Sequence, residues 1–159
     1  MKSSYAALWA IFLLPVIAIS QGKITLTPDM LTNLTTKGDA TLLIDEQQLV
    51  GSPKHTIAGT PATTFNGGYN GMYFPLQVII DLQVLHQLDE LFLYDSFNKD
   101  SLKVYTGSPF NWQLSSTVYL GGWRNWKSVD LNTASRYLML EFPSNKANVA
   151  EIVLYGQSL

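Results

Sequence analysis

The sequence predicts an all-β domain, built as an antiparallel β-sandwich or a barrel. Short apolar runs of strand length recur over residues 75–155, turn residues separate them, and no convincing helical period is found. The clearest pair lies in residues 75–95, where two runs rich in β-branched or aromatic residues flank a short polar joint. We interpret these two runs as the central strands of a sheet.

The pattern before residue 75 is weaker. Residues 23–38 are rich in threonine and support an edge strand at most, while residues 40–44 form a short apolar run that ends in Asp45 and Glu46. Residues 51–74 are rich first in Gly, Pro and Thr and then in glycines set among aromatic residues. This composition indicates loops, the second of which carries aromatic side chains.

From residue 75 onward, short strands follow one another at regular spacing. Turn residues mark the gaps between them, most clearly at 107–109, 121–122 and 143–145. The expected strands are 75–82, 88–95, 101–106, 117–120, 126–131, 136–142 and 150–155.

The first twenty residues predict a cleaved export signal. Lys2 supplies the positive start, an apolar stretch follows over residues 5–19, and small residues precede the expected cut before Gln21. The stretch is shorter than the roughly 20 residues of a spanning helix, so we expect a secreted or periplasmic chain without a transmembrane anchor. The predicted organisation is a signal peptide at 1–20, a lead-in segment at 21–39 and a sandwich domain at 40–159.

Composition excludes several classes of function. One of the 10 Lys and Arg and none of the 12 Asp and Glu lies in the first twenty residues, so the mature chain carries 9 − 12, or −3. Its Lys and Arg do not cluster, which argues against a nucleic-acid partner. Cysteine is absent, which excludes disulfides, thiolate-bound metals and cysteine catalysis.

Strand order predicts which loops lie together. If consecutive strands run antiparallel, alternate connections lie at the same end of a sandwich. The expected sets are 65–74, 95–100, 121–125 and 143–149 at one end, and 83–87, 107–116 and 132–135 at the other.

The first of these ends combines aromatic rings with amides and a guanidinium. A sugar stacks its C–H face on a ring while its hydroxyls pair with amide, carboxylate and guanidinium groups, so we predict a shallow glycan-binding surface. The alternative for any single residue is an ordinary turn residue, or a ring that caps the core. The predicted ligand-binding residues are Tyr69, Asn70, Phe97, Asn98, Trp123, Arg124, Asn125 and Asn145.

No catalytic centre is expected. The two histidines belong to no triad and to no metal-binding spacing. Asp89 and Glu90 are adjacent, so they point to opposite faces of a strand and cannot act as a glycosidase pair. Asp95 and Asp100 flank one loop, and we interpret them as solvated turn residues.

Four short motifs carry a family resemblance. They are LLIDEQ at 42–47, TTF at 63–65, SRYLML at 135–140 and AEIVLYG at 150–156. They resemble the aspartate-bearing turn, the threonine-x-tryptophan signature (with Phe for Trp), the alanine-arginine-tyrosine strand and the closing strand of the discoidin family. This family includes the C-type domains of coagulation factors and galactose-binding-like carbohydrate modules, and the resemblance covers about residues 40–156.

The resemblance implies an eight-stranded, jelly-roll-like sandwich with ligand-binding loops at one end and often a structural calcium ion. It implies that Asp45 and Glu151 help to bind Ca²⁺, with loop carbonyls contributing to the roughly 6 to 8 oxygens that the ion takes. Glu46 stands where the family has glycine. Asn98 matches an asparagine of the carbohydrate modules, but no arginine stands in that loop, so Arg124 would serve instead.

These observations predict an exported, non-catalytic carbohydrate-binding module that recognises a glycan such as a cell-surface polysaccharide. The first alternative is an adhesion module of the same fold that binds a protein partner or lipid, with Trp123 and Arg124 as a docking tip. Trp126 is expected in the core rather than at that tip. A hydrolase or a hydrolase accessory domain is the remaining alternative.

Overall fold

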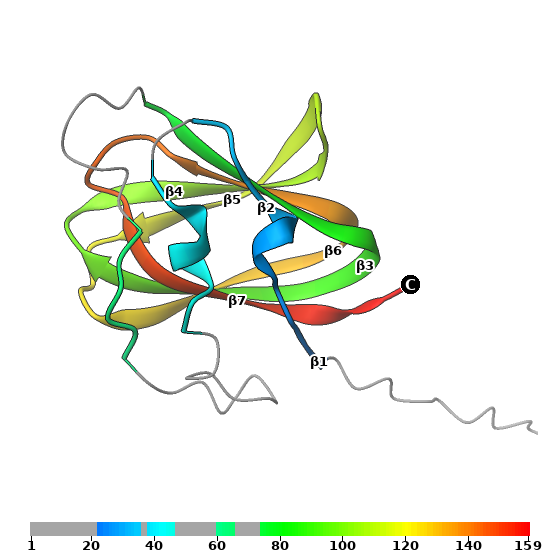
Figure 1. Cartoon of the computed structure of the whole chain (residues 1–159), viewed down its shortest axis with the longest axis horizontal. Helices are drawn as coiled ribbons and strands as arrows, with labels where there is room; N and C mark the ends of the chain where they lie inside the picture. Colours follow the sequence, from blue (N-terminus) through cyan, green and yellow to red (C-terminus); the bar gives the residue numbers. More distant parts are fainter. Residues whose placement is uncertain (1–21, 36–37, 47–59, 66–73) are drawn as a thin grey trace, which may run out of the picture.

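The computed structural model describes residues 22–35, 38–46, 60–65 and 74–159, and this part of the chain is nearly all β (Figure 1). Two short 3₁₀ helices, η1 (Pro28–Met30) and η2 (Ala40–Leu43), accompany the strands. The strands are β1 (Gly22–Ile24), β2 (Leu31–Asn33), β3 (Leu76–Phe97), β4 (Asp100–Ser108), β5 (Asn111–Leu120), β6 (Asn125–Phe142) and β7 (Asn148–Ser158).

The strands form one antiparallel sheet that folds over on itself. Their order is β1-β7-β3-β6-β4-β5, and β2 pairs with β3 beside this path. The predicted all-β class and antiparallel pairing are therefore confirmed. The apolar run predicted at 40–44 contains η2, which ends at Leu43. The Asp39 side chain accepts a hydrogen bond from the backbone N–H of Thr41 at 2.9 Å at the start of this helix.

Strands β3 and β6 each serve two layers. The pairing between them breaks after Asp81 and resumes at His86. Before the break β3 pairs with the second half of β6, and after it β3 pairs with the first half of β6 and with β7. Figure 1 shows both strands turning at the end of the molecule that carries the C-terminus.

The prediction of four separate strands in these regions was wrong. Residues 75–82 and 88–95 belong to the single strand β3, and residues 126–131 and 136–142 belong to β6. The polar joints at 83–87 and 132–135 are bends inside a strand, because left-handed residues at Gln83 (φ 67°) and Asn132 (φ 43°) turn the chain and the β3–β6 pairing resumes beyond the turn.

An ion pair fixes this corner. The Arg136 guanidinium donates to both oxygens of Asp81, from Nε at 2.7 Å and from Nη2 at 2.8 Å. Asp81 Oδ1 also accepts from the backbone N–H of Gln83 at 2.8 Å. One carboxylate thus links β3 to β6 and holds the bend.

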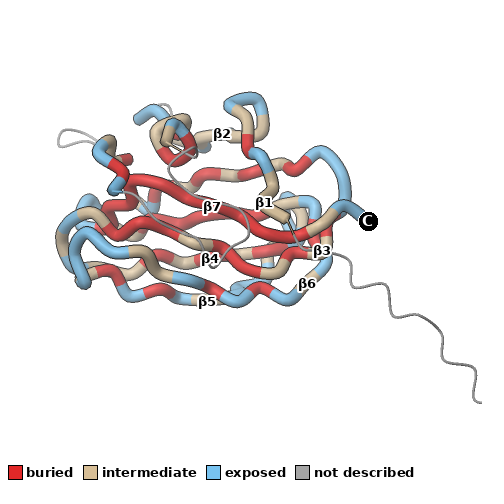
Figure 2. Tube along the Cα trace, turned by 90° about the horizontal axis from the view of Figure 1, so that it is seen from below, coloured by how far each residue is buried: buried red, intermediate tan, exposed pale blue. Residues whose placement is uncertain are grey.

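The main core lies between the two layers. Along β3, Leu76, Val78 and Ile80 are buried while Gln77 and Ile79 between them are only half-buried, which is the period of a strand with one face inward. The first nine residues of β7 are buried, and Figure 2 shows this strand as an almost continuous buried band. The central position of β7 explains why its sequence is apolar without alternation.

A smaller cluster lies on the opposite face of β7. Val153 and Tyr155 are fully buried there, because alternate residues of a strand point to opposite faces, and Phe92 and Trp126 pack against them. Trp126 also meets Tyr94 edge to face at 5.3 Å between ring centroids. The prediction that Trp126 belongs to the core is confirmed.

The remaining connections gather at the end opposite the bends, which we call the loop end. Strand pairing places Asp95 beside Asn125 and Phe97 beside Asn148, so loops 95–100, 121–125 and 143–147 meet there. A bridge between Phe65 and Val149 brings the residues before 66 to the same end. The predicted grouping is confirmed for these loops, whereas residues 66–73 lie outside the described residues.

Candidate functional site

A buried carboxylate holds two loops of the loop end together. Asp95 has no exposed surface, and its Oδ2 accepts from the backbone N–H groups of Gly121 at 2.7 Å and Gly122 at 2.8 Å. The Lys127 ammonium lies 3.9 Å from the same oxygen. The prediction that Asp95 is a solvated turn residue is wrong. The 121–125 loop covers its side chain and donates two backbone hydrogen bonds to the carboxylate.

The neighbouring loops are joined in the same way. Asp100 accepts from the backbone N–H of Ser101 at 2.7 Å and from the hydroxyl of Ser144. The Ser96 hydroxyl donates to the carbonyl of Asn148 at 3.3 Å. Each carboxylate that flanks the 95–100 loop therefore has hydrogen-bond donors that explain its place in the fold.

Two exposed aromatic rings lie side by side on this scaffold. The centroids of Phe97 and Trp123 are 5.1 Å apart with a tilt of 32°, and the two residues are 46% and 56% exposed. Trp123 and Arg124 both have left-handed backbones, with φ of 53° and 48°. Such a conformation costs about 1 kcal/mol or more for a bulky residue, and backbone strain of this kind gathers at functional sites.

A hollow of about 450 Å³ lies beside the ring pair, between the segment 60–64 and the end of β3. Its polar groups are the hydroxyls of two threonines and a serine and one guanidinium, and its aromatic rings are those of a tyrosine and a phenylalanine. The lining residues are Thr60, Pro61, Ala62, Thr64, Tyr94, Ser96, Phe97 and Arg124. The hollow thus joins the two kinds of contact that a sugar requires.

The structure brings together three of the predicted ligand-binding residues. Phe97 and Arg124 line the hollow, and Trp123 stacks against Phe97. Asn125 pairs with Asp95 in the β3–β6 ladder, and its amide lies where a side chain at position 122 would be.

Two other predicted residues, Asn98 and Asn145, stand apart from the hollow. Asn98 is half-buried at the β3–β4 turn with φ 71°, and Asn145 is exposed in the loop before β7. Neither lines the hollow. The predicted residues Tyr69 and Asn70 lie outside the described residues.

Residues 60–64, which form one wall of the hollow, were not among the predicted site residues. The TTF motif contains the relevant signal, because Phe65 is fully buried against Phe142 and its N–H donates to the carbonyl of Val149 at 2.9 Å. An anchored Phe65 at the start of β7 requires the residues just before it to lie at the loop end. Their small side chains carried no functional signal of their own.

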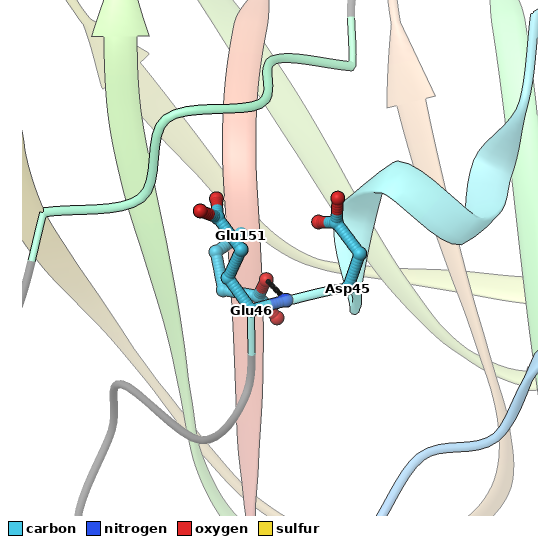
Figure 3. A group of neighbouring side chains, drawn as sticks. All are labelled: Asp45, Glu46 and Glu151. Carbon is cyan, nitrogen blue, oxygen red and sulfur yellow. Dashed lines mark hydrogen bonds between the residues drawn. The ribbon is translucent and has the colours of Figure 1, made fainter.

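A second cluster of polar groups lies behind this wall. Ligand oxygens of Asp45, Glu46 and Glu151 all fall within 4.8 Å of one another. Glu151 comes from β7, whereas the other two follow η2 (Figure 3). The backbone N–H of Glu46 donates to Glu151 Oε2 at 2.8 Å, and Glu46 Oε2 accepts from the N–H groups of Ala62 and Thr63 at 2.8 and 3.2 Å.

Burial and neighbouring carboxylates raise the pKa values of two carboxyl groups of this cluster, those of Glu151 and Asp45. Burial, followed by the nearby Asp45 and Glu46 charges, raises the pKa of Glu151 to about 8, against the lowering effect of its backbone hydrogen bonds. Burial, followed by the Glu46 charge, also raises the pKa of Asp45. Glu151 Oε1 is buried and has no hydrogen-bond partner among the described residues. An oxygen-rich group with an unpartnered buried oxygen is chemically suited to a hard cation such as Ca²⁺.

No helix in the described ranges is long and apolar enough to cross a membrane. The predicted export signal at 1–20 lies outside these ranges.

The fold is similar to that of several carbohydrate-binding modules. The family 32 module of Clostridium perfringens NanJ, solved with galactose, matches with a TM-score of 0.61 and 11% identity over 85% of this chain and 98% of the module. CpGH89CBM32-5 from the same organism, solved with GalNAc-β-1,3-galactose, matches with a TM-score of 0.59 and 12% identity over 83% and 98%. Chitosan-binding module 1 from the chitosanase/glucanase of Paenibacillus sp. IK-5 matches with a TM-score of 0.59 and 13% identity over 86% and 99%.

No protein-family model and no curated protein sequence matches the chain. At the identities given above, the structural likeness establishes the fold and leaves the ligand to be argued from the site. The resemblance to galactose-binding-like, discoidin-like modules is therefore confirmed for the fold.

Proposed function

We propose that this chain is a carbohydrate-binding module that holds a glycan in the hollow between residues 60–64 and Arg124. The observation that supports this most directly is the exposed Phe97–Trp123 ring pair at the mouth of a hydroxyl-rich hollow. A sugar ring placed on Phe97 would bring its hydroxyls within the reach of Thr64, Ser96 and Arg124. The ligands of the structural neighbours, galactose among them, support the same ligand class.

The module acts by binding rather than by catalysis in this proposal. The two carboxylates that flank the 95–100 loop, Asp95 and Asp100, accept hydrogen bonds from backbone N–H groups and from Ser144. The cluster of Asp45, Glu46 and Glu151 lies behind the wall, where Glu46 is bonded to the backbone of residues 62–63. A glycosidase needs two carboxyl groups free to act on the bond, about 5 to 10 Å apart. The export signal predicted at 1–20 is consistent with a glycan outside the cytoplasm.

A lipid-docking role fits the site less well. A membrane-binding tip extends separate apolar side chains beside basic residues. Here the two rings pack on each other, and the hollow beside them is lined by Thr60, Thr64 and Ser96. Hydroxyl groups of this kind favour a polar ligand.

A glycan array followed by calorimetry on the bound glycans tests the proposal. We expect Trp123→Ala and Phe97→Ala each to weaken binding by about tenfold, since a stacking ring is worth about 1 kcal/mol or more. Phe110→Ala is the matched control, because Phe110 is a fully exposed ring with a left-handed backbone at the opposite end of the molecule.

Two results would reject this site. Unchanged glycan binding by both loop-end variants would place the ligand elsewhere. Binding to lipid vesicles that is lost in Trp123→Ala, together with a silent array, would favour the docking alternative.

We also propose that Asp45 and Glu151 bind a structural Ca²⁺, with Glu46 as an additional carboxylate. Glu46 replaces a glycine of the discoidin pattern, yet its side chain lies within the cluster and its Oε2 also secures the backbone of residues 62–63. Calcium bound there would replace the proton that the buried Glu151 retains, balance the charges of Asp45 and Glu46, and support the wall of the hollow. A melting temperature that rises with CaCl₂ and falls with chelator supports this site, and one indifferent to both contradicts it.

A further inference from the structure

We propose that the glycan is acidic, with a carboxylate or sulfate group that Arg124 binds. This inference rests on the glycan-binding function proposed above and specifies the class of its ligand.

Arg124 lacks an anionic partner. Ion pairs are found for Lys103 with Glu141, Lys127 with Asp95 and Arg136 with Asp81, whereas Arg124 forms none with any described residue. All 12 Asp and Glu of the chain fall within the described residues, so no carboxylate side chain has been left out of this comparison. The guanidinium therefore faces the hollow with its donors uncommitted to a carboxylate of the protein.

The hollow itself holds no negative charge. None of its lining residues is acidic, and Arg124 is the one charged residue among them. The nearby cluster of Asp45, Glu46 and Glu151 lies behind the wall, since the N–H groups of residues 62 and 63 point to Glu46. A guanidinium beside hydroxyl groups presents a planar fork of donors that matches the two oxygens of a carboxylate.

Three loops of the loop end carry a small net positive charge on an acidic protein. The loops at 95–100, 121–125 and 143–147 contain three cations and two acids, a sum of 3 − 2 = +1, whereas the chain as a whole has −2. Both acids are already engaged, Asp95 by backbone N–H groups and Asp100 by Ser101 and Ser144. The cations are Lys99, Arg124 and Lys146. Because both acids of these loops are engaged, the three cations favour an anionic ligand at the loop end.

Paired glycans on one array test the inference. Each pair or trio shares a backbone and differs only in its acidic group: a neutral sugar, the corresponding uronic acid and the corresponding sulfate ester. We expect binding of the acidic members at least about tenfold tighter than of the neutral one, and weaker binding as NaCl is raised. The uronate and sulfate arms show which acidic group the hollow takes.

Three variants separate a specific contact from general charge. Arg124→Gln should lose at least about tenfold in affinity for the acidic glycan, and clearly more than it loses for the neutral glycan, whose hydroxyls Arg124 also reaches. Arg124→Lys keeps the charge without the fork and should lie between the two. Lys99→Gln removes one positive charge from the same end outside the hollow, and it should change affinity by less than about threefold. Both replacements at position 124 keep a long unbranched side chain, so the left-handed backbone there is equally strained in the two Arg124 variants.

The outcomes are distinguishable. Acid-selective binding that Arg124→Gln abolishes supports the inference. Binding of neutral and acidic members alike, unchanged in Arg124→Gln, overturns the acidic ligand and leaves the carbohydrate-binding function standing. An array on which neither neutral nor acidic glycans bind overturns both.

Discussion

Replacement of Glu151 by Gln should make the metal-free protein more stable, and more so as the pH rises. Glu151 is fully buried in β7 and its pKa is raised to about 8, mainly by burial. The folded chain therefore keeps this proton up to about pH 8, while the unfolded chain releases it near 4.5. Because the folded state binds more protons in this window, its stability falls as the pH rises through the window.

The size of the effect follows from these two values. Each pH unit between 4.5 and about 8 removes about 1.4 kcal/mol of unfolding free energy, so the loss reaches about 4 to 5 kcal/mol above pH 8. Gln is neutral at every pH and its carbonyl can still accept from the N–H of Glu46. The gain from Glu151→Gln should therefore be near zero at pH 4.5 and largest above pH 8.

Urea unfolding in chelator, from pH 4.5 to 9, measures this difference. Glu141→Gln is the matched control with the opposite sign. Burial raises the pKa of Glu141, but hydrogen bonds from Lys103 and Gln77 outweigh burial and hold it below its usual value. Its stabilisation is present at neutral pH and is lost in acid, so Glu141→Gln should destabilise most above pH 5. A Glu151→Gln gain that does not grow with pH would refute the reasoning.

Two further predictions concern the framework of the site. Asp95→Ala should lower the unfolding free energy by about 2 to 4 kcal/mol and weaken glycan binding, because the N–H groups of Gly121 and Gly122 lose their acceptor. Asp95→Asn should retain more of the stability and more of the affinity. Urea unfolding measures the stability and calorimetry the affinity, and intact glycan binding in Asp95→Ala would contradict the anchoring role. Gly156→Ala should lower the unfolding free energy by at least about 2 kcal/mol, because its Cβ would lie 2.4 Å from the Gln87 carbonyl oxygen. Gly22→Ala has open space around its Cβ and should change the stability little. Equal melting temperatures for the two variants would contradict this packing.

Much of the fold could be predicted because local patterns carried the information. The two apolar runs in residues 75–95 predicted central strands, and both lie in β3 of the sheet. The assignment of loops to one end also held, even though β3 and β6 were each divided into two strands. A bend and a loop both reverse the chain within the sandwich, so the count of reversals was right while the strand boundaries were wrong.

The parts of the site that escaped prediction depend on contacts between distant residues. Asp95 reads as a turn residue in sequence, and only the folding of residues 121–122 over it shows that it is buried. The wall at 60–64 consists of small residues whose position follows from the anchoring of Phe65 on β7. Arg124 could be predicted as a candidate from its residue type. That it forms no ion pair with a described carboxylate became visible only in the structure, where the partners of the acidic residues are seen.

The place where the glycan binds can be measured most directly by titrating it into isotope-labelled protein and following backbone amide shifts by NMR. The account predicts that the largest shifts fall in residues 60–64, at Ser96 and Phe97 and in the 121–125 loop. Residues around Phe110 and the bend at 83–87 should stay unchanged. Shifts confined to that opposite end, with none near Arg124, would contradict the claim that the loop end is the binding surface.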